Sequence, residues 1–225
     1  MPPGILYIVA TPIGNLEDIT FRAVRILKEV DCIAAEDTRR TRGLLTRYDI
    51  HTPLTSLHAH NEATKGEALI RLVQGGKRVA YVTDAGTPGI ADPGTTIVQA
   101  ARAAGLPVVP IPGPCAFVAA ASASGFPTSR LHFVGFLPEK KGRRQTVLEQ
   151  LAHGSATIVC YVAKWDAARY LAECAAVFGE RRAMICRELT KVHEEFREGT
   201  LPQLSGWIER EGARGEFVLL ISGKE

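Results

Sequence analysis

Long hydrophobic runs are absent from this chain: no stretch approaches the roughly 18 apolar residues that a transmembrane helix needs. Cysteine is scarce, and its five residues are scattered without a CxxC pair. We therefore expect reduced cysteines, with no disulfide framework and no zinc site. The first residues also lack the basic segment and the longer apolar run of a secretory signal. These absences together predict a cytosolic protein that does not enter a membrane.

Neither sign of charge dominates the composition. The net charge is +3 at neutral pH, which is compatible with an RNA partner but does not establish one. A hydrophobic fraction of 46% and a charged fraction of 23% are typical of a soluble globular protein. The 225 residues suffice for one large domain or two small ones.

Short apolar runs alternate with helical patterns in the first half of the chain. Strands are expected at 5–10, 32–35, 79–82 and 107–111, and helices at 19–30, 62–73 and 95–104. This alternation predicts a parallel sheet covered by helices.

Three prolines between residues 110 and 114 interrupt this pattern, because proline fits neither a helix interior nor a central strand. Beyond them we expect a small-residue helix at 115–124, strands at 132–136, 157–162, 183–188 and 216–222, and helices near 143–151, 166–178 and 204–211. We place a domain boundary here, which gives two α/β lobes, residues 1–114 and 115–225.

The loop 83–94, TDAGTPGIADPG, follows an apolar run and contains three glycines and two prolines. Glycine lets a ligand approach the backbone closely, and proline fixes the turns in between. Such a loop at the carboxyl end of a strand is where α/β proteins hold ligands. The alternative is a plain connector between strand and helix.

Three further polar segments follow predicted strands: ATPIGNLEDIT at 10–20, AEDTRRTR at 35–42 and RELTKVHEEFREGT at 187–200. The first contains neither GxGxxG nor a Walker lysine, so a phosphate-binding function is excluded there. The second is acidic and then basic, which also suits a solvated helix start with carboxylates at its N-terminus.

The motifs TPIGNLEDIT, AEDTRRT, HAHNE, TDAGTPGIADPG, PGP, GFLP and RELTKVHEE, in this order and spacing, closely resemble those of the bacterial ribosomal RNA 2′-O-methyltransferases of the tetrapyrrole-methylase fold. The resemblance runs from Gly4 to about Ser222. It implies two α/β lobes with S-adenosylmethionine in the cleft between them, usually in a homodimer. It also implies methyl transfer to the ribose of a cytidine in the decoding region of 16S ribosomal RNA.

The resemblance also implies the cofactor contacts. They lie in the first loop, in the glycine-rich loop, at the hinge and at the edges of the second lobe, where the adenine is enclosed. They are Pro12, Ile13, Gly14, Asp84, Ala85, Gly86, Gly89, Ile90, Cys115, Ala116, Tyr161, Val162, Leu189 and Thr190. Small residues there would let backbone groups bond the cofactor, while apolar edges sandwich the base.

The chain departs from the family pattern in two places. After Tyr161, relatives commonly have Ser-Pro-His-Arg where this chain has Ala163-Lys164-Trp165-Asp166, so the rim of the cofactor pocket is expected to differ. Cys115 stands where a serine is more usual, and we interpret it as a small turn residue rather than a nucleophile.

Methylation of a 2′-hydroxyl calls for a base worth about 10²–10⁴-fold, since the hydroxyl is a poor nucleophile until its proton is taken. Glu36 and Asp37 are the leading candidates, with Glu188 and Lys191 behind them. An acid pair after a strand can equally fix Arg39 or cap a helix. If Asp37 is the base, Asp37→Asn keeps cofactor affinity and cuts turnover at least a hundredfold.

RNA contacts are expected from two basic groups. The first comprises Arg39, Arg40, Arg42 and Arg47, and adjoins a family motif. The second comprises Lys140, Lys141, Arg143 and Arg144, and a solvated helix face explains it equally well.

His60 and Glu62 in the HAHNE motif are expected to face the substrate or to cap a helix. A metal pair of His58 and His60 is disfavoured, since no further ligand stands at the required spacing.

Two other functions remain open. A methylase of a tetrapyrrole or another small molecule could use the same fold, although the arginine cluster favours RNA. A non-catalytic ribosome-binding factor would keep the basic patch but would not need the glycine-rich loops.

Overall fold

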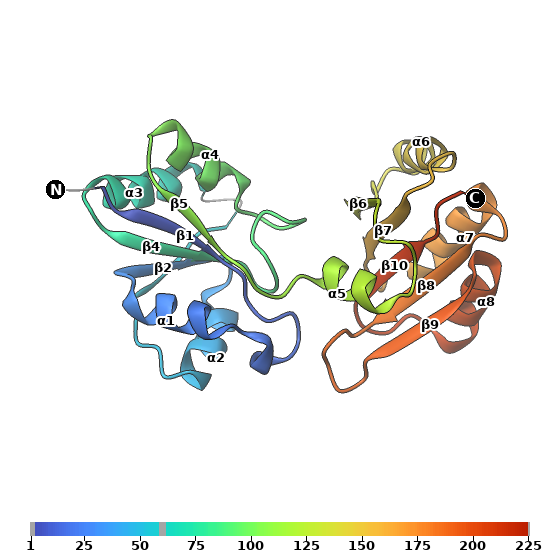
Figure 1. The fold of residues 1–225 in the computed structure, drawn as a ribbon, viewed down its shortest axis with the longest axis horizontal. Helices are drawn as coiled ribbons and strands as arrows, with labels where there is room; N and C mark the ends of the chain where they lie inside the picture. Colours follow the sequence, from blue (N-terminus) through green and yellow to red (C-terminus); the bar gives the residue numbers. More distant parts are fainter. Residues whose placement is uncertain (1–2, 59–61, 225) are drawn as a thin grey trace. The chain divides into compact units, whose positions relative to one another are not determined.

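The computed structural model describes residues 3–58 and 62–224. By its internal contacts the chain divides into two compact units, Met1–Cys115 and Ala116–Glu225 (Figure 1). No helix of the described residues is long and apolar enough to cross a membrane. All five cysteines are free, and three of them are buried.

The first unit is built on a sheet that is parallel throughout, as the alternating pattern predicted. The order across the sheet is β3-β2-β4-β1-β5. The strands are β1 (Ile5–Val9), β2 (Cys32–Ala35), β3 (Leu54–Ser56), β4 (Arg78–Val82) and β5 (Val108–Ile111).

Helices cover both faces of this sheet (Figure 1). α1 (Phe21–Glu29) and α2 (Thr38–Arg47) lie on one face, and α3 (Glu62–Gln74) and α4 (Thr95–Ala103) on the other. Alternate residues of a strand face opposite sides, so Val82 of β4 packs with α1 while Tyr81 packs with α4.

After the neighbouring strands β1 and β4, the chain therefore continues on opposite faces of the sheet. The short helix η1 (Leu16–Asp18) and α1 follow β1, whereas α4 follows β4. Open α/β sheets bind ligands where adjacent strands diverge in this way, outside their carboxyl ends.

The sheet of the second unit is mixed, in the order β6-β7-β10-β8-β9. β6 and β7 are parallel, whereas β10 is antiparallel to both β7 and β8, and β9 is antiparallel to β8. The strands are β6 (Leu131–Phe136), β7 (Thr157–Val162), β8 (Arg182–Arg187), β9 (Glu195–Thr200) and β10 (Phe217–Ile221).

The main core of this unit lies between one face of the sheet and three helices, α6 (Lys141–Leu151), α7 (Ala167–Phe178) and α8 (Leu201–Glu211). α5 (Ala116–Ala123) contacts β7 and β10. Phe117, in the first turn of α5, stacks on Phe133 at 4.3 Å between ring centroids, and its backbone N–H donates to the Tyr161 hydroxyl at 3.2 Å.

The sequence analysis did not predict η1, β3 or β9, whereas a helix start at 35–42, which is α2 here, was one of its alternatives. α8 also begins three residues earlier than expected, and the Gln203 side chain caps its start by accepting from the Thr200 backbone N–H at 3.0 Å.

Candidate active site

Three loops meet at the carboxyl end of the first unit's sheet. Thr11, after β1, exchanges two backbone hydrogen bonds with Gly86, after β4, at 2.9 and 3.0 Å. The Thr11 hydroxyl donates to the Thr83 carbonyl at 3.2 Å, and the Thr87 hydroxyl donates to the Pro114 carbonyl, after β5, at 3.1 Å. The loop 83–94 is thus held by the segments that follow β1 and β5.

Positive backbone φ angles run through this loop: 82° at Gly86, 82° at Gly89, 58° at Ala91 and 131° at Gly94. Gly94 is also short of space, since a Cβ there would lie 2.9 Å from the Tyr81 ring. Ala85, Gly89 and Ile90 of the predicted cofactor loop are exposed. The loop therefore presents backbone and small side chains to a ligand from a fixed conformation.

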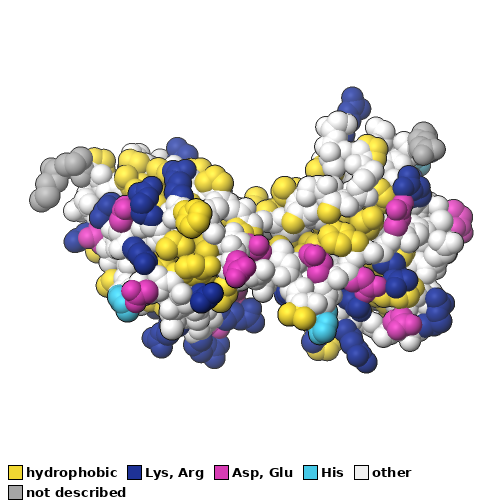
Figure 2. All heavy atoms as spheres, turned by 60° about the horizontal axis from the view of Figure 1, so that its bottom comes forward, with side chains coloured by type: hydrophobic (Ala, Val, Ile, Leu, Met, Phe, Trp, Pro, Cys, Tyr) yellow, Lys and Arg dark blue, Asp and Glu magenta, His cyan; other side chains and the backbone are white. Residues whose placement is uncertain are grey.

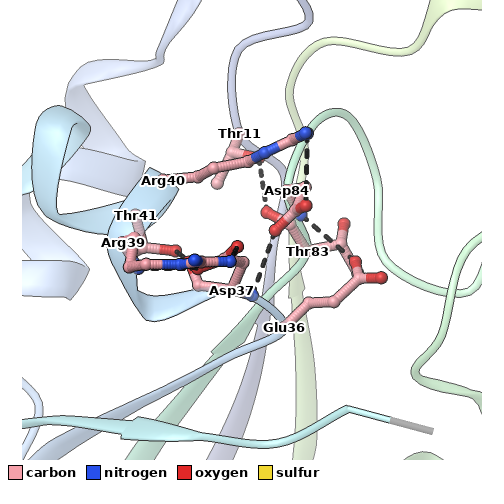
Figure 3. Close-up of polar contacts among 8 residues, drawn as sticks. All are labelled: Thr11, Glu36, Asp37, Arg39, Arg40, Thr41, Thr83 and Asp84. Atoms are coloured by element: carbon pink, nitrogen blue, oxygen red, sulfur yellow. Dashed lines mark hydrogen bonds and ion pairs between the residues drawn. The ribbon is translucent and has the colours of Figure 1, made fainter.

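Acidic side chains from two strand ends converge beside this loop (Figure 3). Glu36 follows β2, and its carboxylate accepts from the Asp84 backbone N–H at 3.4 Å. Asp84 follows β4, and its carboxylate accepts from the Asp37 backbone N–H at 3.0 Å. Burial raises the pKa of the Glu36 carboxyl, and the negative charge of Asp84 raises it further.

Asp92 is a third member of this acidic group; it lies in the glycine-rich motif but was not among the predicted site residues. Asp92 is exposed to solvent as a residue, and partial desolvation of its carboxyl raises its pKa to about 6. The charges of Glu36 and Asp84 add to the effect. Their convergence depends on the sheet order, which places β2 next to β4.

Asp37 has the opposite environment. It is the N-cap of α2 and accepts from the Arg39 backbone N–H at 2.8 Å. Its carboxylate also holds the Arg39 guanidinium at 2.7 Å, and these bonds keep the pKa of Asp37 well below its usual range. Asp37 therefore does both things that the sequence left as alternatives to catalysis: it caps a helix and fixes Arg39.

The arginines after β2 remain accessible to a partner. Arg39 keeps 87% of its side chain exposed, and Arg40 keeps 71% while forming an ion pair with Asp84 at 3.3 Å. Arg42 is exposed as well. Figure 2, in which the α1 and α2 side of the first unit is turned forward, shows Lys and Arg side chains gathered along the lower margin of that unit.

In the second unit, the predicted cofactor residues lie at the ends of β7 and β8. Val162 and Leu189 are buried, and Tyr161 is half-buried. Thr190 has a φ of 65°, which is unusual for a β-branched residue, and its hydroxyl is a buried polar atom without a partner in the part of the chain that the structure describes. Strain and an unsatisfied hydroxyl together favour a ligand contact at this turn.

Lys191 lies next to this turn, with its ammonium between two carboxylates. It donates to Glu188 at 2.9 Å and to Glu216 at 2.7 Å. The Glu188 carboxylate also accepts from the Glu216 backbone N–H, so Lys191 joins the end of β8 to the start of β10. In this position Lys191 stabilises the turn. Its ammonium already carries the proton that a base would have to accept.

The structure corrects the prediction that all four residues of the second basic group contact RNA. Arg144 is only 1% exposed and binds Glu173 through two hydrogen bonds of 2.5 and 2.8 Å, so it faces the interior and not an RNA. The other three members, Lys140, Lys141 and Arg143, are exposed. His60 lies outside the described residues. Glu62 begins α3, but its side chain is likewise not described.

The two-lobed architecture and the loops at its strand ends correspond to a known family. Residues 5–205 match the model of the Tetrapyrrole (Corrin/Porphyrin) Methylases. The chain belongs to this family.

Named relatives cover nearly the whole chain. A "Ribosomal RNA small subunit methyltransferase I" of Halalkalibacterium halodurans is 48% identical over 220 residues, which are 98% of this chain and 76% of that protein. A protein of the same name from Pseudomonas aeruginosa is 46% identical over 226 residues, 99% of this chain and 80% of that protein.

Solved structures show the same fold. A uroporphyrin-III-C-methyltransferase from Thermus thermophilus aligns with a TM-score of 0.68 at 23% identity, covering 97% of this chain and 94% of that one. A cobalt precorrin-4 methyltransferase aligns with a TM-score of 0.74 at 17% identity, covering 99% and 97%. At these identities the likeness establishes the fold of two α/β lobes and leaves the acceptor open.

The methyl donor of the family is S-adenosylmethionine. The residues of this chain fit such a group. The exposed small residues of loop 83–94 offer backbone donors and acceptors, and Thr190 offers a hydroxyl that lacks a partner among the described residues. No group of three or more His, Cys, Asp or Glu is arranged for a metal ion in residues 3–58 and 62–224.

Proposed function

We propose that this chain transfers the methyl group of S-adenosylmethionine to the 2′-hydroxyl of a cytidine in the decoding region of small-subunit ribosomal RNA. The names of relatives at 46–48% identity support the acceptor class. The single observation that carries the proposal in this chain is the half-buried Glu36 carboxylate bonded to Asp84 close to exposed arginines, which pairs a proton acceptor with cations for a polyanion.

The bound donor supplies an electrophilic methyl group on a sulfonium. The protein must bring the hydroxyl into line with it, and well-oriented intramolecular reactions gain roughly 7–11 kcal/mol from such positioning. The loop 83–94 suits this task, because its hydrogen bonds to the segments after β1 and β5 hold it in place. We assign donor contacts in the first unit to this loop, including Asp84, Ala85 and Gly89.

We assign the proton acceptor to Glu36 rather than to Asp37. A general base is most effective when its pKa lies near the working pH. Burial raises the pKa of Glu36, while Arg39 lowers that of Asp37. Asp92, with a pKa of about 6, is the second carboxyl suited to hold a proton in this group.

Arg39, Arg40 and Arg42 are assigned to the RNA backbone. All three are exposed at the start of α2. Each phosphate contact contributes about one unit to the slope of log affinity against log salt. Arg39→Met should therefore flatten that slope by about one unit, and an unchanged slope would remove Arg39 from the interface.

The proposal is tested by incubating the protein and labelled S-adenosylmethionine with unmodified small subunits or with a tetrapyrrole, and locating the label by mass spectrometry. Label on a ribose 2′-oxygen supports the proposal, and label on the pigment or on neither acceptor overturns it. Glu36→Gln should reduce single-turnover methylation at least a hundredfold. Glu29→Gln, an exposed carboxylate of α1, is the matched control that should leave the rate unchanged.

The proposal includes a cytoplasmic location, where ribosomal RNA is modified, and a homodimer, as the family resemblance implies. Sedimentation of the purified chain measures its oligomeric state, and a monomer at assay concentrations would contradict the homodimer.

A further inference from the structure

A cavity of about 210 Å³ opens on the first unit, at the carboxyl ends of its sheet. The segment after β1 contributes Pro12 and Leu16, α2 contributes Arg40 and Leu44, and the end of β4 contributes Thr83 and Asp84. The cavity therefore has apolar walls and a polar end. It lies in the region where open α/β sheets bind ligands.

The polar end has capacity for hydrogen bonds that the protein does not use. Thr83 is 2% exposed, and its hydroxyl has no partner within the described residues. An unsatisfied buried hydroxyl is destabilising, and a bound ligand would supply its missing partner. The Thr11 hydroxyl donates to the Thr83 carbonyl and keeps its own lone pairs as acceptors.

The positively charged side chain of Arg40 lines this cavity. Arg40 is 71% exposed and extends across Asp84 (Figure 3). The neighbouring Arg39 is 87% exposed. An anionic group next to the occupant of the cavity would therefore meet the Arg40 guanidinium, and guanidinium groups bind phosphates well.

We propose that this cavity receives one unstacked base of the RNA strand, with the adjoining phosphate on Arg40. This inference rests on the proposed function. Proteins recognise single-stranded RNA by splaying bases out into apolar sites and binding their edges. The volume is below the roughly 300–1,000 Å³ of pockets for drug-sized ligands, so it suits a single base and not a tetrapyrrole.

The geometry also fits the chemistry of a ribose acceptor. Asp84 lines the cavity and bonds to Glu36 through its backbone N–H. A nucleotide whose base lies in the cavity would therefore lie next to Asp84, whose backbone N–H binds the proposed proton acceptor Glu36. Extracting the base from its stack is unfavourable, and contacts with the apolar walls and the Thr83 hydroxyl would offset that cost.

Gly43 allows the cavity to be filled without damage to the fold. It lines the cavity from α2, and a Cβ built there meets no heavy atom within 4 Å. A side chain should also stabilise the helix, since glycine is a poor helix former. Gly43→Met places a flexible apolar chain where the base would lie. Gly142→Met is the matched control: Gly142 is an exposed glycine of α6 in the other unit with equally open surroundings.

The test measures the anisotropy of a fluorescent single-stranded oligocytidylate over a series of salt concentrations. Gly43→Met should weaken binding at least tenfold and leave the salt slope unchanged, because the phosphate contacts remain. Gly142→Met should bind within twofold of wild type. Calorimetry of S-adenosylmethionine binding should give the same affinity for all three proteins. Binding by Gly43→Met that equals wild type, or a loss accompanied by a flatter salt slope, overturns the base site.

The two proposals fail separately. If wild-type protein methylates no RNA but Gly43→Met still weakens oligonucleotide binding, the methyltransferase proposal fails and the base site stands. If wild type methylates small subunits and Gly43→Met does so with the same KM, the base site fails and the function stands.

Discussion

Replacement of Arg144 by methionine should destabilise the second unit strongly without affecting RNA binding. The guanidinium is 1% exposed and makes four hydrogen bonds: two to the Glu173 carboxylate, one to the Pro138 carbonyl at 2.8 Å and one to the Glu139 carbonyl at 2.7 Å. It also lies 4.6 Å from the centroid of the Tyr170 ring. The arginine therefore ties α6 to α7 and to the segment before α6.

The magnitude follows from what the substitution leaves behind. Breaking a buried ion pair by removing one partner costs about 3–5 kcal/mol. Glu173 keeps 17% of its side chain exposed, so water partly solvates it and we expect the lower end, about 3 kcal/mol. Removing both charges in Arg144→Met/Glu173→Met should recover part of this loss, to a deficit of about 1–2 kcal/mol, because the two carbonyls still lack a donor.

Tryptophan fluorescence during urea unfolding is a suitable assay. The chain has two tryptophans, Trp165 and Trp207, and both lie in the second unit. The signal thus reports this unit alone, which avoids assuming a single transition for the whole chain. Arg143→Met, an exposed neighbour, should change stability by no more than about 0.5 kcal/mol. A loss below 1 kcal/mol in Arg144→Met, or weaker RNA binding at unchanged stability, would refute the reasoning.

Three further predictions concern the site loops. Asp92 has its pKa raised from 3.8 to about 6, so the folded state binds more protons than the unfolded one between these values, and stability falls as pH rises through them. Asp92→Asn should remove this fall, which thermal unfolding across that range would measure at about 1 kcal/mol or less, given solvent screening. Gly94→Ala should cost about 1–3 kcal/mol by chemical denaturation, because its φ is 131° and the new Cβ would lie 2.9 Å from Tyr81; a neutral result would show that the loop can relax. Lys191→Met should weaken S-adenosylmethionine binding severalfold through the Thr190 turn while single-turnover methylation at saturating donor stays unchanged, and a loss of that rate would instead make Lys191 catalytic.

The sequence predicted the fold where strands are buried on both faces. β1, β4 and β10 are apolar runs, so their positions were expected to within about two residues. β9 was missed because it is an edge strand with the sequence EFREGT, whose charges are typical of edges and give no apolar signal. The antiparallel pairing of β10 was equally invisible, since strand direction depends on long-range order across the sheet.

Arg144 shows that one member of a run of basic residues can be buried while its neighbours are exposed. Four basic residues around position 142 look alike in sequence, yet one of them faces the core. The helical period carries a signal that separates it from its exposed neighbours: Arg144, Leu148 and Leu151 are spaced four and three apart and lie on one buried face of α6. A basic residue in step with an apolar stripe is therefore better interpreted as a buried ion-pair partner than as an RNA contact.

The acidic group of Glu36, Asp84 and Asp92 could not be predicted from local sequence patterns. Asp92 lies 56 residues from Glu36 along the chain, and their coupling depends on β2 and β4 being neighbours. No local motif reports such a distance. The glycine-rich loop that contains Asp92 was recognised as a ligand loop, but the burial that shifts its carboxyl comes from the folded surroundings.

Glu36 and Asp37 are adjacent carboxylates, and the fold gives them opposite properties. Glu36 turns toward Asp84, where burial and like charges favour its protonated form. Asp37 turns toward the start of α2, where the Arg39 N–H and guanidinium favour its ionised form. Environments that push two pKa values apart assign different roles to the pair. The residue that stays ionised suits a permanent tie that positions an arginine for the RNA, whereas the residue whose charge is costly gains most from taking a proton, which is what a base for a ribose hydroxyl must do.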